Sequence, residues 1–333
     1  MIRIPFEMMK EQLKSVLLKR GMQCSDAELC STLIAETSLD GVYTHGANRF
    51  SVLVKAIDEK VVDVQAHAML YESFGCFERW NGQGGVGNLN AYACMKRAIA
   101  LSQEHTIGCV ALKNTNHWMR PGTYGLMAAE QDCIGILWTN TIPLMPSWGG
   151  LDAKVGNNPL VLAIPAQEGP ILVDMAMSLF SYGKLETYAR EDCPLPVTGG
   201  YDQEGQLTKD AAQILLSKRP LPIGFWKGTS LALALDLIAA SLSGGRTTRS
   251  VGTLQAETQV SQVFLSFNLC GFSDRKNIEK EIQATLDDLR QSEPVDGNAT
   301  VRFPGENRQK IRSENLRLGI PVDTTIWQAI LAL

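Results

Sequence analysis

The stretch NGQGGVGNLN, residues 81–90, decides between two kinds of α/β fold. Its glycines have the G-x-G-x-x-G spacing of a dinucleotide-binding loop: Gly82, Gly84 and Gly87. Such a loop follows a strand, opens a helix and needs an acidic residue at the end of the next strand to hold the ribose. The flanking segments predict the strand and the helix, but the next strand, residues 107–114, ends in Lys113 and Asn114. The alternative is a tight turn that leads into a helix.

The composition indicates a folded protein that binds small molecules or copies of itself. In the 333-residue chain, 45% of residues are hydrophobic and 20% charged, which is ordinary for a globular protein. The net charge of -4 provides no basic field for nucleic acid. No apolar run could span a bilayer and the first residues lack the apolar core of a signal peptide, so we expect a cytoplasmic protein. The eight cysteines show no zinc-ligand spacing, and we expect no metal site.

Helical patterns at the two ends of the chain enclose a centre of short apolar runs. Residues 1–60 predict three helices, and the tail predicts two more, the first ended by Gly319 and the second opened by Asp323. The runs between residues 110 and 175 predict buried strands. The run TSLALALDLIAASLSGG, residues 229–245, predicts a core helix under the sheet. We therefore expect the two termini to share a domain around a central sheet.

The segment YTHGANRF places His45 four residues before Arg49. If Thr44 caps a helix here, the two side chains lie one turn apart on the same helix face. A helix N-terminus disfavours the imidazolium, so His45 would exchange a proton near neutral pH. Arg49 is suited to a substrate carboxylate. The alternative is a surface histidine and a solvated arginine.

Polar residues gather after two of the expected strands, where α/β proteins place ligands. The segment NTNHWMRPGTYG offers hydrogen-bonding groups to a hydroxylated acid: Asn114, Asn116, His117 and Arg120. Asp174 ends an apolar run, where a carboxylate is costly unless it has a partner. It fits either a residue that fixes the tautomer of a histidine or a simple helix cap. Lys227, just before an expected helix start, suits a pyrophosphate or is merely solvated.

Six segments, in this order and spacing, resemble the signature blocks of the type-2 malate/L-lactate dehydrogenase family: DGVYTHGANRF, NTNHWMRPGTYG, GNNPLVLAIP, LVDMAMSLFSYGKLE, PIGFWKGTSLALALDLIAA and VRFPGE. The resemblance covers nearly the whole chain and is strongest to the 2,3-diketo-L-gulonate reductase branch, through NHWMR and FSYG. It implies that family's own α/β fold without a Rossmann unit, in which a central mixed sheet accompanies helical N- and C-terminal segments packed together. The glycines of residues 81–90 are then turn residues.

The resemblance also implies roles for individual residues. His45 matches the proton donor and Asp174 the carboxylate that supports the reaction, while Arg49 and His117 match residues that face the substrate. The family's cofactor contacts fall on Pro170, Ile171, Leu172, Val173, Asp174, Met175, Ala176, Trp226, Lys227, Gly305, Glu306 and Asn307. We expect a helical substrate and catalytic domain at residues 1–75, completed by residues 300–333, and a central α/β dinucleotide-binding region at residues 76–299.

These observations predict an NAD(P)H-dependent oxidoreductase that acts on CH–OH groups and reduces a 2-oxo acid, with 2,3-diketo-L-gulonate favoured and NADH, or NADPH, as cofactor. The alternatives within the family are malate/lactate, ureidoglycolate and cyclic imino-acid dehydrogenases or reductases. Outside enzymes, the alternative is a non-catalytic protein that binds a dinucleotide or sugar acid. A proton donor such as His45 argues against it, because a binding protein needs none. We expect a homodimer with no nucleic-acid or membrane partner.

Overall fold

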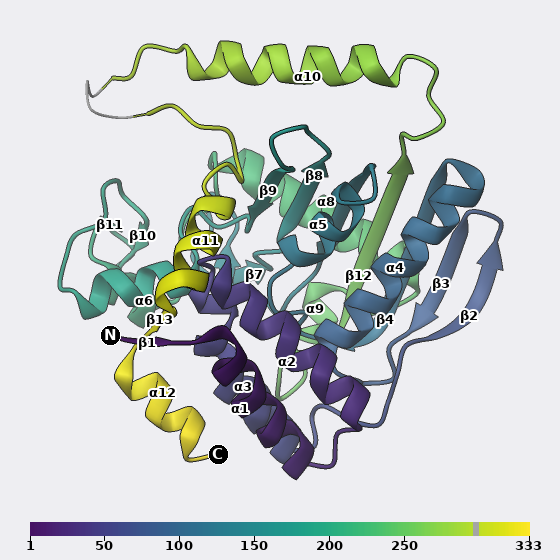
Figure 1. Ribbon diagram of the computed structural model, residues 1–333. Coiled ribbons are helices and arrows are strands. Elements are labelled where there is room, and N and C mark those ends of the chain that lie inside the picture. The colour runs from purple at the N-terminus through teal and green to yellow at the C-terminus, as the bar shows by residue number, and fades with distance from the viewer. Residues whose placement is uncertain (296–299) are drawn as a thin grey trace.

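A mixed sheet of seven strands forms the centre of the molecule in the computed structural model, which describes residues 1–295 and 300–333 (Figure 1). Across the sheet the strands are β2 (Met69–Phe74), β3 (Phe77–Asn81), β4 (Ile107–Asn116), β12 (Thr258–Asn268), β5 (Cys133–Thr139), β8 (Leu160–Ile164) and β9 (Ile171–Met175). Neighbouring strands are antiparallel, except that β3 and β4 run parallel. The expected mixed α/β sheet is thus confirmed.

Helices cover both faces of this sheet because its central strands are apolar on both sides. Val110 and Leu112 of β4 belong to the core beneath α4 (Gly87–His105) and α5 (Gly122–Ala129). Ala111, between them, belongs to the core beneath α8 (Trp226–Ser243) on the opposite face. Alternation with a period of two, which places neighbouring side chains on opposite faces of a strand, produces this three-layer arrangement.

The prediction that α8 is a core helix holds for its inner side only. Ala232, Leu235 and Ala239 are buried against the sheet. The outer side of α8 is just as apolar but exposed, with Leu233 and Leu237 each 50% accessible. A helix that is apolar all round is expected to be buried on all sides, but this outer face has no partner among residues 1–295 and 300–333.

The glycine stretch at residues 81–90 is a turn packed against the end of β4. Gly82 N–H donates to the carbonyl of Lys113 at 2.8 Å, and Gly84 N–H donates to that of Asn114 at the same distance. A Cβ added to Gly87 would overlap the carbonyl oxygen of His117. The backbone donors of a phosphate-binding loop are therefore used inside the protein, which confirms the fold without a Rossmann loop.

The two termini meet in one helical body, visible at the lower left of Figure 1. The antiparallel pairing of β1 (Ile2–Ile4) with β13 (Ile320–Val322) joins them. One apolar core is shared by this pair and the expected terminal helices: α1 (Phe6–Lys19), α2 (Cys24–Leu39), α3 (Ala47–Asp58) and α12 (Thr324–Leu331). α11 (Arg308–Leu318) ends at Gly319, and Asp323 caps α12 through Thr325 N–H at 2.8 Å, as the sequence predicted.

The remaining elements are short, apart from α10, and lie outside the central sheet. They are η1 (Tyr43–His45), β6 (Met145–Pro146), β7 (Ala153–Val155), α6 (Tyr182–Arg190), β10 (Gly200–Tyr201), β11 (Leu207–Thr208), α7 (Ala211–Ser217), α9 (Thr248–Val251) and α10 (Arg275–Arg290). Figure 1 shows the ribbon of α10 set apart from the sheet. The domain boundary expected at residue 299 falls on residues 296–299, outside the described residues. No helix of the described residues combines the length and apolar character needed to cross a membrane.

Candidate active site

A cavity of about 640 Å³ lies between the helical body and the edge of the central sheet. Its walls come from η1, α3 and α12 of the helical body, and from β9, β12 and α6. All four residues expected to act on a substrate line this cavity: His45, Arg49, His117 and Asp174. Segments up to about 280 residues apart in the sequence thus converge on one space.

His45 enters the cavity from η1 rather than from the first turn of a helix. α3 starts after Gly46, and its Ala47 N–H donates to Ser38 Oγ of α2 at 2.8 Å. A Cβ on Gly46 would overlap that same hydroxyl, so only glycine allows this close approach. The predicted Thr44 cap is therefore wrong, because Ser38 performs the capping from another helix.

The rings of His45 and His117 are stacked, with centroids 6.0 Å apart and planes 10° from parallel. The Nδ1 atom of His117 accepts a hydrogen bond from Met119 N–H at 3.0 Å. A neutral His117 must then carry its proton on Nε2. For His45, Nδ1 lies 3.3 Å from Thr44 Oγ1. Both imidazoles are therefore oriented by groups within two residues of themselves.

Both histidines are neutral near pH 7 in this environment. Burial, helped by the charges of Arg49 and Arg120, lowers the pKa of His45 to about 4. Burial and the neighbouring Arg49 and His45 also hold the pKa of His117 well below its usual value. The sequence predicted that a helix N-terminus would poise His45 near neutrality. Desolvation and arginine charges act instead, and they shift the pKa further.

Asp174, at the end of β9, holds the loop that follows His117 rather than an imidazole. Its Oδ2 accepts a hydrogen bond from Gly122 N–H, at the start of α5, at 2.9 Å. The carboxylate opens on the cavity, but surrounding protein desolvates it and raises its pKa against the opposing effects of Arg120 and Gly122 N–H. Among the described residues, no hydrogen bond joins Asp174 to His45 or His117. The expected direct orientation of an imidazole by Asp174 is thus absent here.

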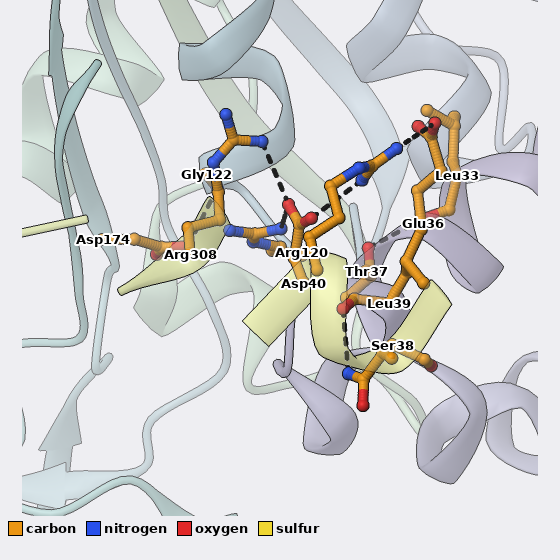
Figure 2. Close-up of polar contacts among 12 residues, drawn as sticks. Leu33, Glu36, Thr37, Ser38, Leu39, Asp40, Arg120, Gly122, Asp174 and Arg308 are labelled. Carbon is orange, nitrogen blue, oxygen red and sulfur yellow. Dashed lines mark hydrogen bonds and ion pairs between the residues drawn. The ribbon is translucent and has the colours of Figure 1, made fainter. Parts of the chain in front are cut away.

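A buried ionic cluster stands beside this loop (Figure 2). Asp40, the C-terminal cap of α2, accepts hydrogen bonds from Arg120 at 2.7 Å, Arg308 at 3.3 Å and Arg312 at 2.8 Å. Burial would raise the pKa of Asp40, but these arginines lower it below its usual value. The cluster fastens the His117 loop to α2 and α11. Its partners are about 80 to 270 residues apart, so sequence spacing could not reveal it.

Of the NTNHWMR residues expected to bind substrate hydroxyls, only His117 lines the cavity. The others bind groups of the protein itself. The amide of Asn114 donates to Asn81, and that of Asn116 donates to the carbonyls of Gly84 and Gly85. The guanidinium of Arg120 is bound to Asp40. These side chains hold the turn and the ionic cluster together, which explains why polar residues gather there.

Other polar residues line the cavity that the sequence did not single out. The walls also include Glu257, just before β12, Gln262 on β12 and Tyr182 of α6. The Glu257 Oε2 atom lies 3.9 Å from Arg49 Nη2. Tyr182 lies in the FSYG segment, whereas Glu257 and Gln262 belong to no recognisable motif and are identified only by the path of β12 through the sheet.

The three segments expected to hold a cofactor come together around β9. Leu172 N–H donates to the carbonyl of Pro304 at 2.9 Å, which places residues 303–307 beside β9. Ile223 N–H donates to the carbonyl of Met177 at 2.9 Å, which brings the start of α8 to the end of the same strand. β9 is the edge strand of the sheet. The segment at residues 170–176 also reaches the cavity through Asp174 and Ala176.

In comparison with known proteins, residues 4–331 of the chain match the family model for malate/L-lactate dehydrogenase. A curated protein of Citrobacter koseri named 2,3-diketo-L-gulonate reductase is 42% identical over 334 residues, with all of both chains covered. The malate dehydrogenase structure from Pyrococcus horikoshii is similar, with a TM-score of 0.89 and 27% identity, covering 98% of this chain and 93% of that one. Sulfolactate dehydrogenase from Methanocaldococcus jannaschii superimposes with a TM-score of 0.90 and 26% identity, covering 99% and 95%.

Proposed function

The chain belongs to the malate/L-lactate dehydrogenase family, and on that premise we propose that it reduces a small 2-oxo acid with a nicotinamide cofactor. It is an oxidoreductase of the 2-hydroxy and 2-oxo acid class. We propose 2,3-diketo-L-gulonate as the substrate and NADH as the cofactor, supported by the name of the 42% identical relative. The observation that carries the proposal is the convergence of His45, His117 and Arg49 on one cavity, beside the segments suited to a dinucleotide.

The residues around β9 fit a dinucleotide. An edge strand has backbone donors and acceptors that its own sheet does not use. At the start of α8, the Trp226 indole is 61% exposed and can cover an aromatic ring, while Lys227 supplies a cation for a pyrophosphate. Gly305, with φ of 95°, lets its segment approach β9 closely, because a Cβ there would lie 3.1 Å from the Pro170 carbonyl. When bound, the reduced nicotinamide would supply the hydride.

His45 would donate the proton to the carbonyl oxygen of the substrate, and Arg49 would pair with its carboxylate. A bound carboxylate offsets the Arg49 charge that lowers the pKa of His45, so substrate binding favours the protonated donor. His117 would donate from Nε2 to a substrate oxygen, because Met119 N–H occupies Nδ1. Asp174 would keep His117 in place through Gly122. In this scheme residues 1–75, completed by residues 300–333, would supply His45 and Arg49 to the substrate, and residues 76–299 would supply His117 and most of the cofactor contacts, joined by residues 305–307.

We also propose that the protein is a homodimer, and the outer face of α8 supports it. Leu231, Leu233, Leu237 and Ile238 are each 37 to 50% accessible and form an apolar face along one helix. Symmetric pairing is the commonest arrangement of soluble oligomers. Light scattering should report a dimer, and the double variant Leu233→Asp, Leu237→Asp should report a monomer. A wild-type monomer at working concentration would contradict this arrangement.

The test of the activity is the loss of NADH absorbance when 2-oxo acids are added one at a time. A polyhydroxylated acid such as 2,3-diketo-L-gulonate should support turnover, and substitution of NADPH in the same assay compares the two cofactors. The other activities of the family are tested with malate, lactate or ureidoglycolate and NAD+, where absorbance of NADH should rise, and with a cyclic imino acid and NADH, where it should fall. Binding of cofactor and sugar acid without any turnover would instead indicate a non-catalytic protein.

A further inference from the structure

Glu257 stands in the cavity wall beside Arg49, the residue that would bind the substrate carboxylate. Its side chain is 20% accessible, and its Oε2 lies 3.9 Å from Arg49 Nη2. This separation is too long for a hydrogen bond, so Arg49 keeps its N–H donors available while Glu257 offsets part of its charge. Burial raises the pKa of Glu257, whereas Arg49 and the N–H of Ile142 oppose that shift.

Among the described residues, the charges around the cavity leave no interior cation for a second carboxylate. Arg120 is close enough to affect the pKa of His45, but its guanidinium is bound to the buried Asp40. Arg190 lines the cavity only from the exposed end of α6, where solvent screens its charge. Two carboxylates, Asp174 and Glu257, already face the interior. One substrate carboxylate can pair with Arg49, and another would meet like charge.

A second observation points to ligand hydroxyls at the same wall. Gln262, five residues after Glu257, is fully buried and lines the cavity. Its amide Nε2 donates to the carbonyl of Asn116 at 3.5 Å, while its Oε1 has no partner within the described residues. A buried acceptor without a donor is costly, and a donor from a ligand would satisfy it.

We propose that Glu257 is a specificity-determining residue: it excludes 2-oxo acids with a second carboxylate and, together with Gln262, accepts hydrogen bonds from substrate hydroxyls. This inference rests on the proposed function, since it concerns which 2-oxo acids the site reduces. A site with acceptors aimed at hydroxyls rejects analogues that lack them, because its buried polar groups are then left unpaired. Like-charge juxtaposition inside a closed site disfavours the wrong partner in the same way.

The test compares kcat/KM for pyruvate, hydroxypyruvate and oxaloacetate at saturating NADH. Glu257→Gln preserves the shape of the side chain and removes its charge, so oxaloacetate should gain about tenfold or more relative to hydroxypyruvate. Glu59→Gln, at the exposed end of α3, removes the same charge far from the cavity and should leave that ratio unchanged. Gln262→Met should lower hydroxypyruvate relative to pyruvate by about tenfold, without favouring oxaloacetate.

The outcomes separate this inference from the proposed function. If Glu257→Gln lowers all three substrates in parallel, Glu257 only holds Arg49 and the inference is overturned. An unchanged oxaloacetate to hydroxypyruvate ratio overturns it as well, while the reductase activity of the wild type stands. If wild-type protein that binds NADH reduces none of the 2-oxo acids tested, the proposed function fails and this inference fails with it.

Discussion

His45 and His117 face each other across 6.0 Å with nearly parallel rings, and neither imidazole has a carboxylate partner among the described residues. Arg49 lowers the pKa of both. Burial and the positive charge of Arg49 keep both imidazoles neutral. A substrate anion that pairs with Arg49 offsets this charge, so its binding can control which of the two imidazoles takes up a proton. The following predictions depend on this arrangement.

Replacing His45 with Ala should lower kcat by about 10²- to 10⁴-fold, the usual contribution of a positioned general acid. Cofactor affinity should change little, because the segments around β9 do not include this residue. Steady-state kinetics and NADH titration measure the two quantities separately. His105→Ala, at the far end of α4, provides the matched control and should retain full activity. An unchanged rate in a folded His45→Ala protein would remove His45 from the mechanism.

The pH dependence of the free protein should report the lowered pKa of His45. NMR titration of its imidazole should give a pKa of about 4. Because reduction consumes a proton from the protonated donor, kcat/KM should fall as pH rises above that value, and His45→Ala should lose this limb. Arg49→Met removes a positive charge that lowers the pKa, so the His45 titration should move upward. A His45 pKa that stays the same in Arg49→Met would show that Arg49 does not contribute to it and that burial and Arg120 set it.

Asp40 should contribute more to stability than any exposed carboxylate of the chain. Asp40→Asn leaves Arg120, Arg308 and Arg312 without their shared counter-charge, and breaking such a buried cluster costs about 3–5 kcal/mol. Glu36→Gln is the control and should cost about 1 kcal/mol or less, since Glu36 is 39% accessible and its one ion pair within the described part of the chain is with Arg312. Urea unfolding measures both changes. Similar small losses in the two variants would contradict a central role for Asp40.

The sequence predicted those helices and strands whose bounds depend on patterns within a few neighbouring residues. Terminal helices, buried strands and the boundaries at Gly319 and Asp323 follow from periodicity and capping, which act over a few residues. The cap of α3 was missed because Ser38 supplies it from a neighbouring helix. Polar residues of NTNHWMR suggested substrate contacts, although tertiary packing directs most of them into the turn at residues 81–90.

The residues of the candidate site also fall into those that local sequence patterns predict and those that only the tertiary structure reveals. His117 follows β4, Asp174 lies near the end of β9 and Arg49 lies in the first turn of α3, three elements that local patterns predict. The partner of Asp174 could not be predicted, because Gly122 reaches it through a backbone N–H, which carries no residue signature. Glu257 and Gln262 join the cavity only through the position of β12 between β4 and β5, a long-range pairing that local patterns do not encode.

Substitutions of the glycines at residues 81–90 distinguish a structural turn from a dinucleotide-binding loop. Gly84 has a φ of 70° and open space around its Cβ position, so Gly84→Ala should cost about 1 kcal/mol through backbone strain alone. Gly87→Ala would push against the carbonyl of His117 and should displace that histidine. We therefore expect near wild-type turnover for Gly84→Ala and reduced turnover for Gly87→Ala, with NADH affinity preserved in both. Fluorescence titration of NADH and steady-state kinetics measure these effects. A selective loss of NADH affinity in folded Gly84→Ala protein would return the cofactor to this loop.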